Sequence, residues 1–276
     1  MRETRRALAV VLLLLGMLWV IAAVAEGSVQ FGAPAPAPTP TATPSSADVP
    51  WTYPISQEIL ADPLDVLVLA NREHRLASDY PPNDELHKMV KVTLPKTSGS
   101  EMTLRKTMHD ALAVMFEAAE AEGIKLYVES AYRSYQSQKS IYGNRIARLG
   151  YDDLVSQPEG ASEHQTGLTA DILNWAWRDR AMNTGFAKTK EAQWMAANCA
   201  RFGFILRYPE GKKEITGINY EPWHLRYVGV EVAEYMTANS LTLEEFTTEV
   251  LIAEADYLLR QQQSETVYVT EPSFSF

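Results

Sequence analysis

The spacing of apolar residues predicts three helices in the middle of this chain. Over Thr103–Glu122 the apolar positions recur every three or four residues, and Gly123 follows where the end of a helix favours glycine. Further helices are predicted over Ser134–Arg148, with the serine as N-cap, and over Lys188–Phe202 before Gly203. Shorter apolar segments separate these helices along the chain.

The shorter apolar segments predict strands. They are the alternating segment around Ile124, Leu126 and Val128, the runs Leu168–Leu173, Phe204–Tyr208 and Trp223–Val228, the position of Ile215, and the strand-like run Val66–Ala70. Helices combined with short strands of this kind predict an α+β fold, with a small, mainly antiparallel sheet and helices packed on it.

A fourth helix is predicted in residues 241–276. Thr242 and Glu245 fit a capping box at its start. The apolar positions that follow step by three and four residues and are Leu243, Phe246, Val250, Ala253 and Tyr257. We expect this amphipathic helix to pack on its own domain, and a partner protein is the alternative.

The N-terminal residues 1–26 have the pattern of a targeting segment. Three arginines precede the charge-free run Ala7–Ala25, which is 19 residues long and close to the roughly 20 residues of a membrane-spanning helix. We predict a signal anchor that contacts the membrane through residues 7–25. A signal peptide cleaved near Ala25 is the alternative. Both place the rest of the chain outside the cytoplasm.

Composition divides the remainder of the chain. Residues 27–50 are rich in proline, alanine and threonine and predict an extended linker, which leaves 51–240 as the folded domain and 241–276 as an acidic extension. That extension carries seven acids and one arginine, so six of the ten net negative charges lie in it. No basic stripe suits nucleic acid, which excludes that class of partner. The single Cys199 excludes an intrachain disulfide.

Two of the five histidines are candidates for chemistry. His74, His87 and His109 have no acid at ligand spacing, and we predict that they are solvated or structural. His164 and His224 differ, because they stand among small, apolar or aromatic residues and each has a carboxylate nearby. Those carboxylates are Asp171 and Glu221.

The chain must bend if each of these pairs shares one site. Seven extended residues would hold His164 and Asp171 about 24 Å apart, and Gly167 permits a bend between them. Pro222 excludes a helix interior between Glu221 and His224, so this pair requires a turn or bulge. Two histidines and a carboxylate are a common ligand set for catalytic Zn²⁺, and a second carboxylate can act as base. By spacing alone, core histidines that bind no metal remain the favoured alternative.

Three longer segments resemble a known enzyme family. The segments SAYRSYQSQ, EGASEHQTGLTADI and GFILRYPEGKKEITGINYEPWHLRYVG are similar to those of VanY-type D-alanyl-D-alanine carboxypeptidases, zinc metallopeptidases related to VanX, lysostaphin and hedgehog domains. The resemblance spans about Pro63 to Ser240 and leaves out both ends of the chain. One position departs from it, since Thr169 stands where the family often has alanine.

The resemblance implies roles for individual residues. It implies Zn²⁺ in a cleft on the sheet, with His164, Asp171 and His224 as ligands. It also implies that Glu221 is the catalytic base and that Arg133 faces the substrate. Gln138 and Ser162 would line the same pocket. From the residues alone, Arg133 lies between a predicted strand and a helix start, so its paired donors can project into a cleft, with a surface salt bridge as the alternative.

The implied activity is hydrolysis of the terminal D-Ala-D-Ala bond of a peptidoglycan stem peptide or its precursor. An L,D-carboxypeptidase that trims tetrapeptide stems is the nearest alternative, with the same metal and a different pocket. A non-catalytic wall-binding domain and a membrane-tethered interaction module are two alternatives of another class. In the second of these the acidic C-terminal helix would carry the function.

Overall fold

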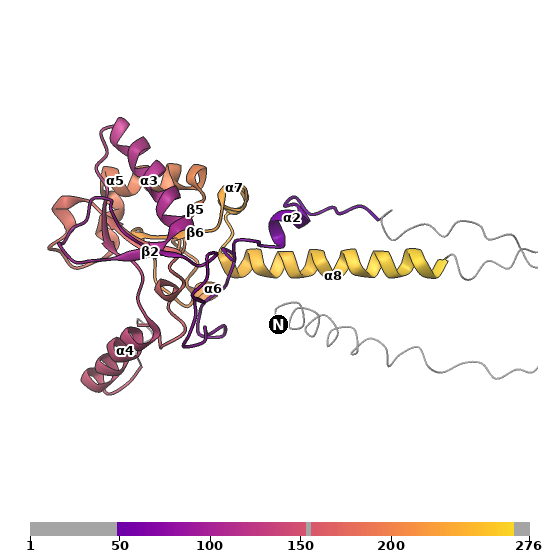
Figure 1. Ribbon diagram of the computed structural model, residues 1–276, viewed down its shortest axis with the longest axis horizontal. Helices are drawn as coiled ribbons and strands as arrows, with labels where there is room; N and C mark the ends of the chain where they lie inside the picture. Colours follow the sequence, from indigo (N-terminus) through magenta and orange to yellow (C-terminus); the bar gives the residue numbers. More distant parts are fainter. Residues whose placement is uncertain (1–48, 153–155, 268–276) are drawn as a thin grey trace, which may run out of the picture. The chain divides into compact units, whose positions relative to one another are not determined.

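The computed structural model describes residues 49–152 and 156–267 (Figure 1). One compact unit comprises Tyr53–Val250, and a second comprises the two ends of the chain, Met1–Thr52 and Leu251–Phe276. The predicted targeting segment and most of the predicted linker lie outside the described residues. Among the residues that are described, no helix is both long and apolar enough to cross a membrane.

A four-stranded antiparallel sheet forms the centre of the unit Tyr53–Val250, with strand order β3-β4-β6-β5. Its strands are β3 (Tyr127–Ser130), β4 (Thr169–Leu173), β5 (Phe204–Leu206) and β6 (His224–Tyr227). A separate antiparallel pair joins β1 (Met89–Lys91) and β2 (Thr103–Arg105). The predicted α+β class with a small antiparallel sheet is therefore confirmed.

Helices precede, separate and follow these strands along the chain (Figure 1). They are α2 (Gln57–Leu60), α3 (Lys106–Ala121), α4 (Tyr135–Leu149), α5 (Lys190–Asn198), α6 (Lys213–Thr216), α7 (Val230–Ala238) and α8 (Leu243–Val267). Single turns of 3₁₀ helix are η3 (Glu163–Thr166), η4 (Trp175–Trp177), η5 (Thr184–Lys188) and η6 (Cys199–Phe202). The first predicted helix is α3, although its first three residues belong to β2. The other two are α4, capped by the side chain of Ser134, and α5 continued by η6.

The apolar face of α3 and the inner face of the sheet share one hydrophobic core. Met108, Leu112 and Met115 of α3 are fully buried, as are Ile172 of β4 and Leu225 of β6. Full burial of a leucine or methionine side chain stabilises a fold by about 1.5–3 kcal/mol. This core fixes β4 and β6, the two central strands, which carry Asp171 and His224 of the candidate site.

Two strand predictions are wrong. Val66–Ala70 forms no strand, because the carbonyl oxygens of Val66 and Val68 accept hydrogen bonds from Arg226 Nη2 at 2.8 and 2.7 Å instead of from a neighbouring strand. Ile215 lies in the short helix α6, whose backbone amides bond back to the carbonyl of Lys212. A single apolar residue among polar neighbours, such as Ile215, carries too weak a signal to distinguish a strand from a helix.

The structural role expected for His87 is confirmed, but the absence of a nearby acid is wrong. This buried imidazole places Nδ1 2.8 Å from Asp84 Oδ1 and Nε2 2.7 Å from Asp65 Oδ2. Asp84 precedes the histidine by three residues, and Asp65 lies far from it in sequence. Pairing with two carboxylates uses both ring nitrogens for structure.

The capping box at the start of α8 is confirmed. The amide of Thr242 donates to Glu245 Oε2 at 2.8 Å, and the amide of Glu245 donates to Thr242 Oγ1 at 3.2 Å. Leu243 and Phe246 are buried, so the beginning of α8 packs on the unit Tyr53–Val250. In the other unit, the rings of Trp51 and Tyr257 make an edge-to-face contact with their centroids 5.4 Å apart.

Candidate metal and catalytic site

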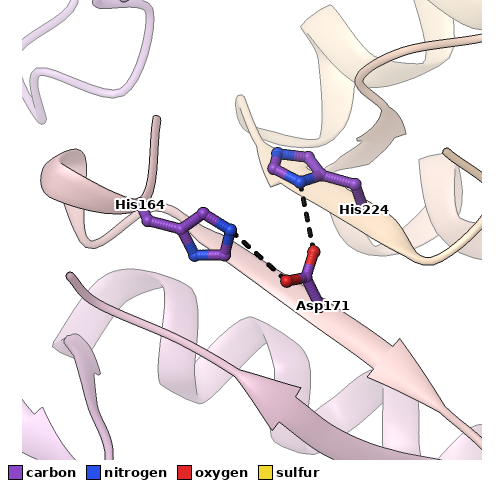
Figure 2. Close-up of side chains that lie close together, drawn as sticks. All are labelled: His164, Asp171 and His224. Atoms are coloured by element: carbon purple, nitrogen blue, oxygen red, sulfur yellow. Dashed lines mark ion pairs between the residues drawn. The ribbon is translucent and has the colours of Figure 1, made fainter. Parts of the chain in front are cut away.

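Two central strands and a 3₁₀ turn bring together the three predicted metal ligands (Figure 2). Asp171 of β4 stands opposite His224 of β6 in the strand register, and His164 comes from η3. Asp171 Oδ2 lies 3.4 Å from His164 Nε2, and Asp171 Oδ1 lies 3.1 Å from His224 Nδ1. One ligand atom of each residue lies within 4.8 Å of the other two.

Gly167 provides the predicted bend between His164 and Asp171. It ends η3 in the left-handed conformation, with φ of 69°, and β4 then begins at Thr169. A Cβ at this position would lie 3.0 Å from both Arg105 Cγ and Met89 Sδ. The backbone conformation and the close neighbours both favour glycine, and the bend returns the chain so that Asp171 faces the histidine.

We expect Gly167→Ala to destabilise the protein more than Gly150→Ala does. Both glycines have a left-handed backbone, which costs an L-residue about 1–2 kcal/mol, but a Cβ at Gly150 meets nothing within 4 Å. The difference between the two variants in free energy of unfolding, measured in urea, reports the crowding at Gly167. Equal losses would show that the contacts with Arg105 and Met89 do not matter.

Glu221 and His224 share the site through the turn that Pro222 required. The amide of His224 donates to the carbonyl of Glu221 at 3.2 Å, which closes the turn just before β6. Glu221 Oε2 consequently lies 3.4 Å from His224 Nδ1. Burial raises the pKa of the Glu221 carboxyl to about 7, although the charges of His224 and Arg133 oppose the shift. A carboxyl with a pKa near neutrality suits a group that accepts and returns a proton.

The donor set of the cluster fits a zinc ion. His164 Nδ1 lies 2.7 Å from the carbonyl oxygen of Ala131, which places the ring proton on Nδ1 and leaves Nε2 as a metal donor. Burial would raise the pKa of Asp171, but the neighbouring imidazoles of His164 and His224 have the larger effect and lower it. Among the described residues, Asp171 Oδ1 is a buried oxygen without a hydrogen-bond partner. Buried polar atoms are rarely left so, and a cation bound there would satisfy it.

A cavity of about 440 Å³ opens over this cluster. The predicted substrate residues Arg133, Gln138 and Ser162 all line it, together with Glu221. Arg133 Nη1 donates to Gln138 Oε1 at 3.0 Å, so Gln138 orients the guanidinium. Further lining residues are Arg145, Ser156, Gln157, Glu163, Met182, Tyr208, Ile218 and Trp223.

The sequence analysis assigned no role to several residues near the site. Glu163, Arg207 and Arg226 are fully buried, and Glu163 pairs with both arginines and lies 3.8 Å from His224 Nε2. Ser130 of β3 stands opposite Asp171, and its Oγ lies 3.4 Å from Arg133 Nη2. The available signal was an arginine inside each of the apolar runs FILRY and HLRYVG, where a buried strand position favours an apolar residue.

An aspartate and a histidine on neighbouring strands, with a second histidine from a 3₁₀ turn and a glutamate beside them in the cavity, are typical of a metal-dependent hydrolase. Residues 101–230 match the family model of VanY, D-alanyl-D-alanine carboxypeptidase. The carboxypeptidase-like protein YodJ of Bacillus subtilis (strain 168) is 39% identical over 196 residues, which cover 70% of this chain and 71% of YodJ. The chain therefore belongs to the VanY family of carboxypeptidases.

Solved structures of both specificities resemble this chain. The LD-carboxypeptidase LdcB, described with its basis of peptidoglycan recognition, has a TM-score of 0.63 at 38% identity and covers 68% of this chain and 87% of its own. A mutant of the vancomycin resistance D,D-pentapeptidase VanY, in complex with Zn(II), has a TM-score of 0.51 at 32% identity. That match covers 66% of this chain and 98% of the other.

Proposed function

We propose that this chain is a zinc-dependent carboxypeptidase that hydrolyses the terminal D-Ala-D-Ala bond of peptidoglycan stem peptides. The observation that carries the proposal is the buried cluster of His164, Asp171 and His224, with Glu221 beside it in the cavity. The family description and the Zn(II) complex of the VanY mutant support the activity and the metal. A non-catalytic wall-binding domain has no need of Glu221 at this position.

The residues of the chain divide the reaction between them. When bound by His164, Asp171 and His224, zinc supplies a Lewis acid that makes water a stronger nucleophile near neutral pH. Glu221 accepts a proton from the attacking water and then donates it to the nitrogen of the departing D-alanine. The water oxygen first forms its bond to the scissile carbonyl carbon. The bond from that carbon to the nitrogen then breaks as the nitrogen takes the proton from Glu221. The products are a shortened stem peptide and free D-alanine.

Arg133 binds the carboxylate at the end of the substrate or the oxygen of the scissile carbonyl. A guanidinium offers paired donors that suit a carboxylate, and Gln138 holds it in one orientation. The backbone amide of Arg133 also donates to the carbonyl of His164 at 3.1 Å, which ties the arginine to the metal cluster. Ser162, which precedes η3 and is buried, supplies a hydroxyl at the same wall.

We expect Arg133→Lys to lower kcat/KM for the stem peptide by about 10–150-fold. Lysine keeps the charge but loses the paired geometry, and a hydrogen bond to a charged group contributes about 1.5–3 kcal/mol. Steady-state release of D-alanine measures the change, and Arg148→Lys on the exposed part of α4 is the control. A loss of the same size in both variants would remove Arg133 from the substrate site.

An L,D-carboxypeptidase that trims tetrapeptides is a second candidate, because LdcB resembles this chain over 68% of its length. Purified full-length chain should be incubated with synthetic pentapeptide and tetrapeptide stems, with zinc present or chelated. Zinc-dependent release of D-alanine from the pentapeptide is the expected result. Release from the tetrapeptide alone would move the assignment to L,D specificity. No release from either peptide would favour the wall-binding domain or the interaction module.

We also propose that residues 7–25 anchor the protein to the membrane with its catalytic domain outside the cytoplasm. The charge-free run behind three arginines supports this proposal, and it lies outside the described residues. Alkaline carbonate extraction of cell membranes tests it. An anchored chain stays in the pellet, whereas a chain cleaved near Ala25 appears in the medium.

A further inference from the structure

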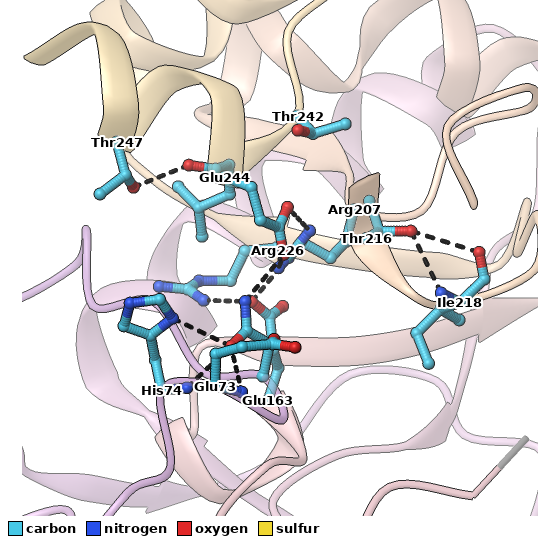
Figure 3. A network of polar contacts seen from close by, with 12 residues as sticks. Glu73, His74, Glu163, Arg207, Thr216, Ile218, Arg226, Thr242, Glu244 and Thr247 are labelled. Carbon is cyan, nitrogen blue, oxygen red and sulfur yellow. Dashed lines mark hydrogen bonds and ion pairs between the residues drawn. The ribbon is translucent and has the colours of Figure 1, made fainter. Parts of the chain in front are cut away.

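Three fully buried charges and one partly buried charge form a network next to His224. Figure 3 shows its members Glu163, Arg207, Arg226 and Glu244. Glu163 Oε1 accepts two hydrogen bonds of 2.7 Å, one from Arg207 Nε and one from Arg226 Nη1. All three of these side chains are completely buried. The two charge-assisted hydrogen bonds from the arginines hold the Glu163 carboxylate in a fixed position. Glu163 is thus a fixed carboxylate next to the metal ligand His164 in the chain.

Arg207 also connects Glu163 to the C-terminal helix α8. Arg207 Nη1 and Nη2 donate to the two carboxylate oxygens of Glu244 at 2.8 and 2.6 Å, while Arg207 Nε holds Glu163. Glu244 lies in the first turn of α8, and its side chain is 14% exposed. Arg207 therefore bridges two glutamates in a paired geometry that fixes the plane of its guanidinium. Figure 3 shows Glu244 reaching from α8 toward Arg207.

The second oxygen of Glu163 faces a metal ligand. His224 turns Nδ1 toward Asp171, so its Nε2 points the other way and lies 3.8 Å from Glu163 Oε2. Among the described residues, this buried Nε2 has no hydrogen-bond partner. A histidine that binds a metal through one nitrogen carries its proton on the other, and a carboxylate near that proton fixes the orientation of the ring. Because Oε1 is occupied by two arginines, Oε2 is the oxygen that faces the proton.

Thr169 touches the same oxygen. Its hydroxyl donates to Glu163 Oε2 at 3.4 Å, which is long for a hydrogen bond. This is the position at which the sequence departs from the common family pattern. The hydroxyl lies beside the carboxylate that faces His224. Threonine at this position leaves all three proposed metal ligands in place.

We propose that Glu163 is a positioning residue for His224, and that the first turn of α8, through Glu244 and Arg207, holds Glu163 in place. The inference rests on the proposed function, because it takes His164, Asp171 and His224 as the zinc ligands. It makes the start of the C-terminal extension a structural part of the metal site. Glu244 acts at a distance and touches neither substrate nor metal.

Adjacent glutamates in one helical turn allow a matched test. Glu244→Gln removes the charge that holds Arg207, whereas Glu245→Gln removes a charge that bonds Lys212, and glutamine still serves in a capping box. In Glu163→Gln the two arginines require the amide oxygen, so the amide NH₂ faces the proton of His224. Loss of an outer-shell partner typically weakens metal binding by about 10–100-fold.

Zinc affinity of the full-length chain should be measured by competition with a chromogenic chelator. We expect Glu163→Gln to bind zinc about 10–100-fold more weakly and Glu244→Gln about tenfold more weakly, with Glu245→Gln unchanged. Thermal unfolding of each metal-free variant shows whether it is folded. A folded Glu244→Gln variant with the affinity of the unmodified chain would overturn the inference. If the unmodified chain binds no zinc, the proposed function fails as well.

A second measurement uses the unmodified chain and is independent of how the variants fold. Long-range ¹H–¹⁵N spectra of the zinc-loaded protein report which nitrogen of His224 carries the proton and how fast that proton exchanges with water. We expect a proton on Nε2 that exchanges slowly, because it faces Glu163 in a buried site. A proton on Nδ1, or one on Nε2 that exchanges rapidly, would contradict the role of Glu163.

Discussion

Glu221→Gln should reduce the turnover of the pentapeptide stem by about 10²–10⁴-fold, the range that a positioned general acid or base contributes. Glutamine has nearly the same shape but cannot accept a proton from water and return it to the leaving nitrogen. Glu221 lies 3.4 Å from His224 Nδ1 and lines the cavity. We therefore expect kcat to fall, while zinc content and KM change little.

The measurement for Glu221 is steady-state release of D-alanine, with zinc content determined on the same samples. Glu210→Gln is the matched control, because this exposed glutamate lies in the turn before α6. A Glu221→Gln variant that keeps its zinc and more than about a tenth of the activity would be inconsistent with a general base, since such a base contributes at least about 100-fold.

Asp171→Asn should abolish zinc binding and activity together. The substitution keeps the size of the side chain but removes the anionic charge between His164 and His224. The loss of a ligand should exceed the roughly 100-fold upper range for loss of an outer-shell partner. We expect zinc affinity to fall by more than about 100-fold and D-alanine release to fall with it, because hydrolysis depends on the bound metal.

A matched control for this ligand is Asp179→Asn. Asp179 is an exposed acid paired with Arg178, and it lies a few residues beyond β4. The zinc affinity of this control, measured by chelator competition, and its D-alanine release should both equal those of the unmodified chain. If Asp171→Asn retained zinc at the original affinity, Asp171 would not be a ligand.

Local chemistry predicted the turns that bring the site residues together, whereas the roles of these residues as ligands and base came from the family resemblance. Gly167 marked the bend after His164, Pro222 required a turn before His224, and Thr242 with Glu245 marked the start of α8. Each of these signals depends on the conformational preferences of a few neighbouring residues. The central strands were predicted for a similar reason, since their apolar runs are short and bounded by turn residues.

The network beneath the site could not be predicted in the same way. Arg207 pairs with Glu163 at a separation of 44 residues and with Glu244 at 37, so no local pattern connects them. From the sequence alone, an arginine is expected to be exposed, because its burial depends on partners that a local pattern does not reveal. The strand prediction for Val66–Ala70 was wrong for the same reason. Arg226, far along the chain, donates hydrogen bonds to the carbonyl oxygens of Val66 and Val68.

We propose that one zinc ion at His164, Asp171 and His224 supports removal of D-alanine. The most direct measurement is a titration of the metal-free full-length chain with zinc, in which D-alanine release from the pentapeptide and bound zinc are recorded together. We expect activity to rise from near zero and to reach its plateau at one zinc per chain. Full activity in the metal-free chain, or zinc binding without any release of D-alanine, would contradict it.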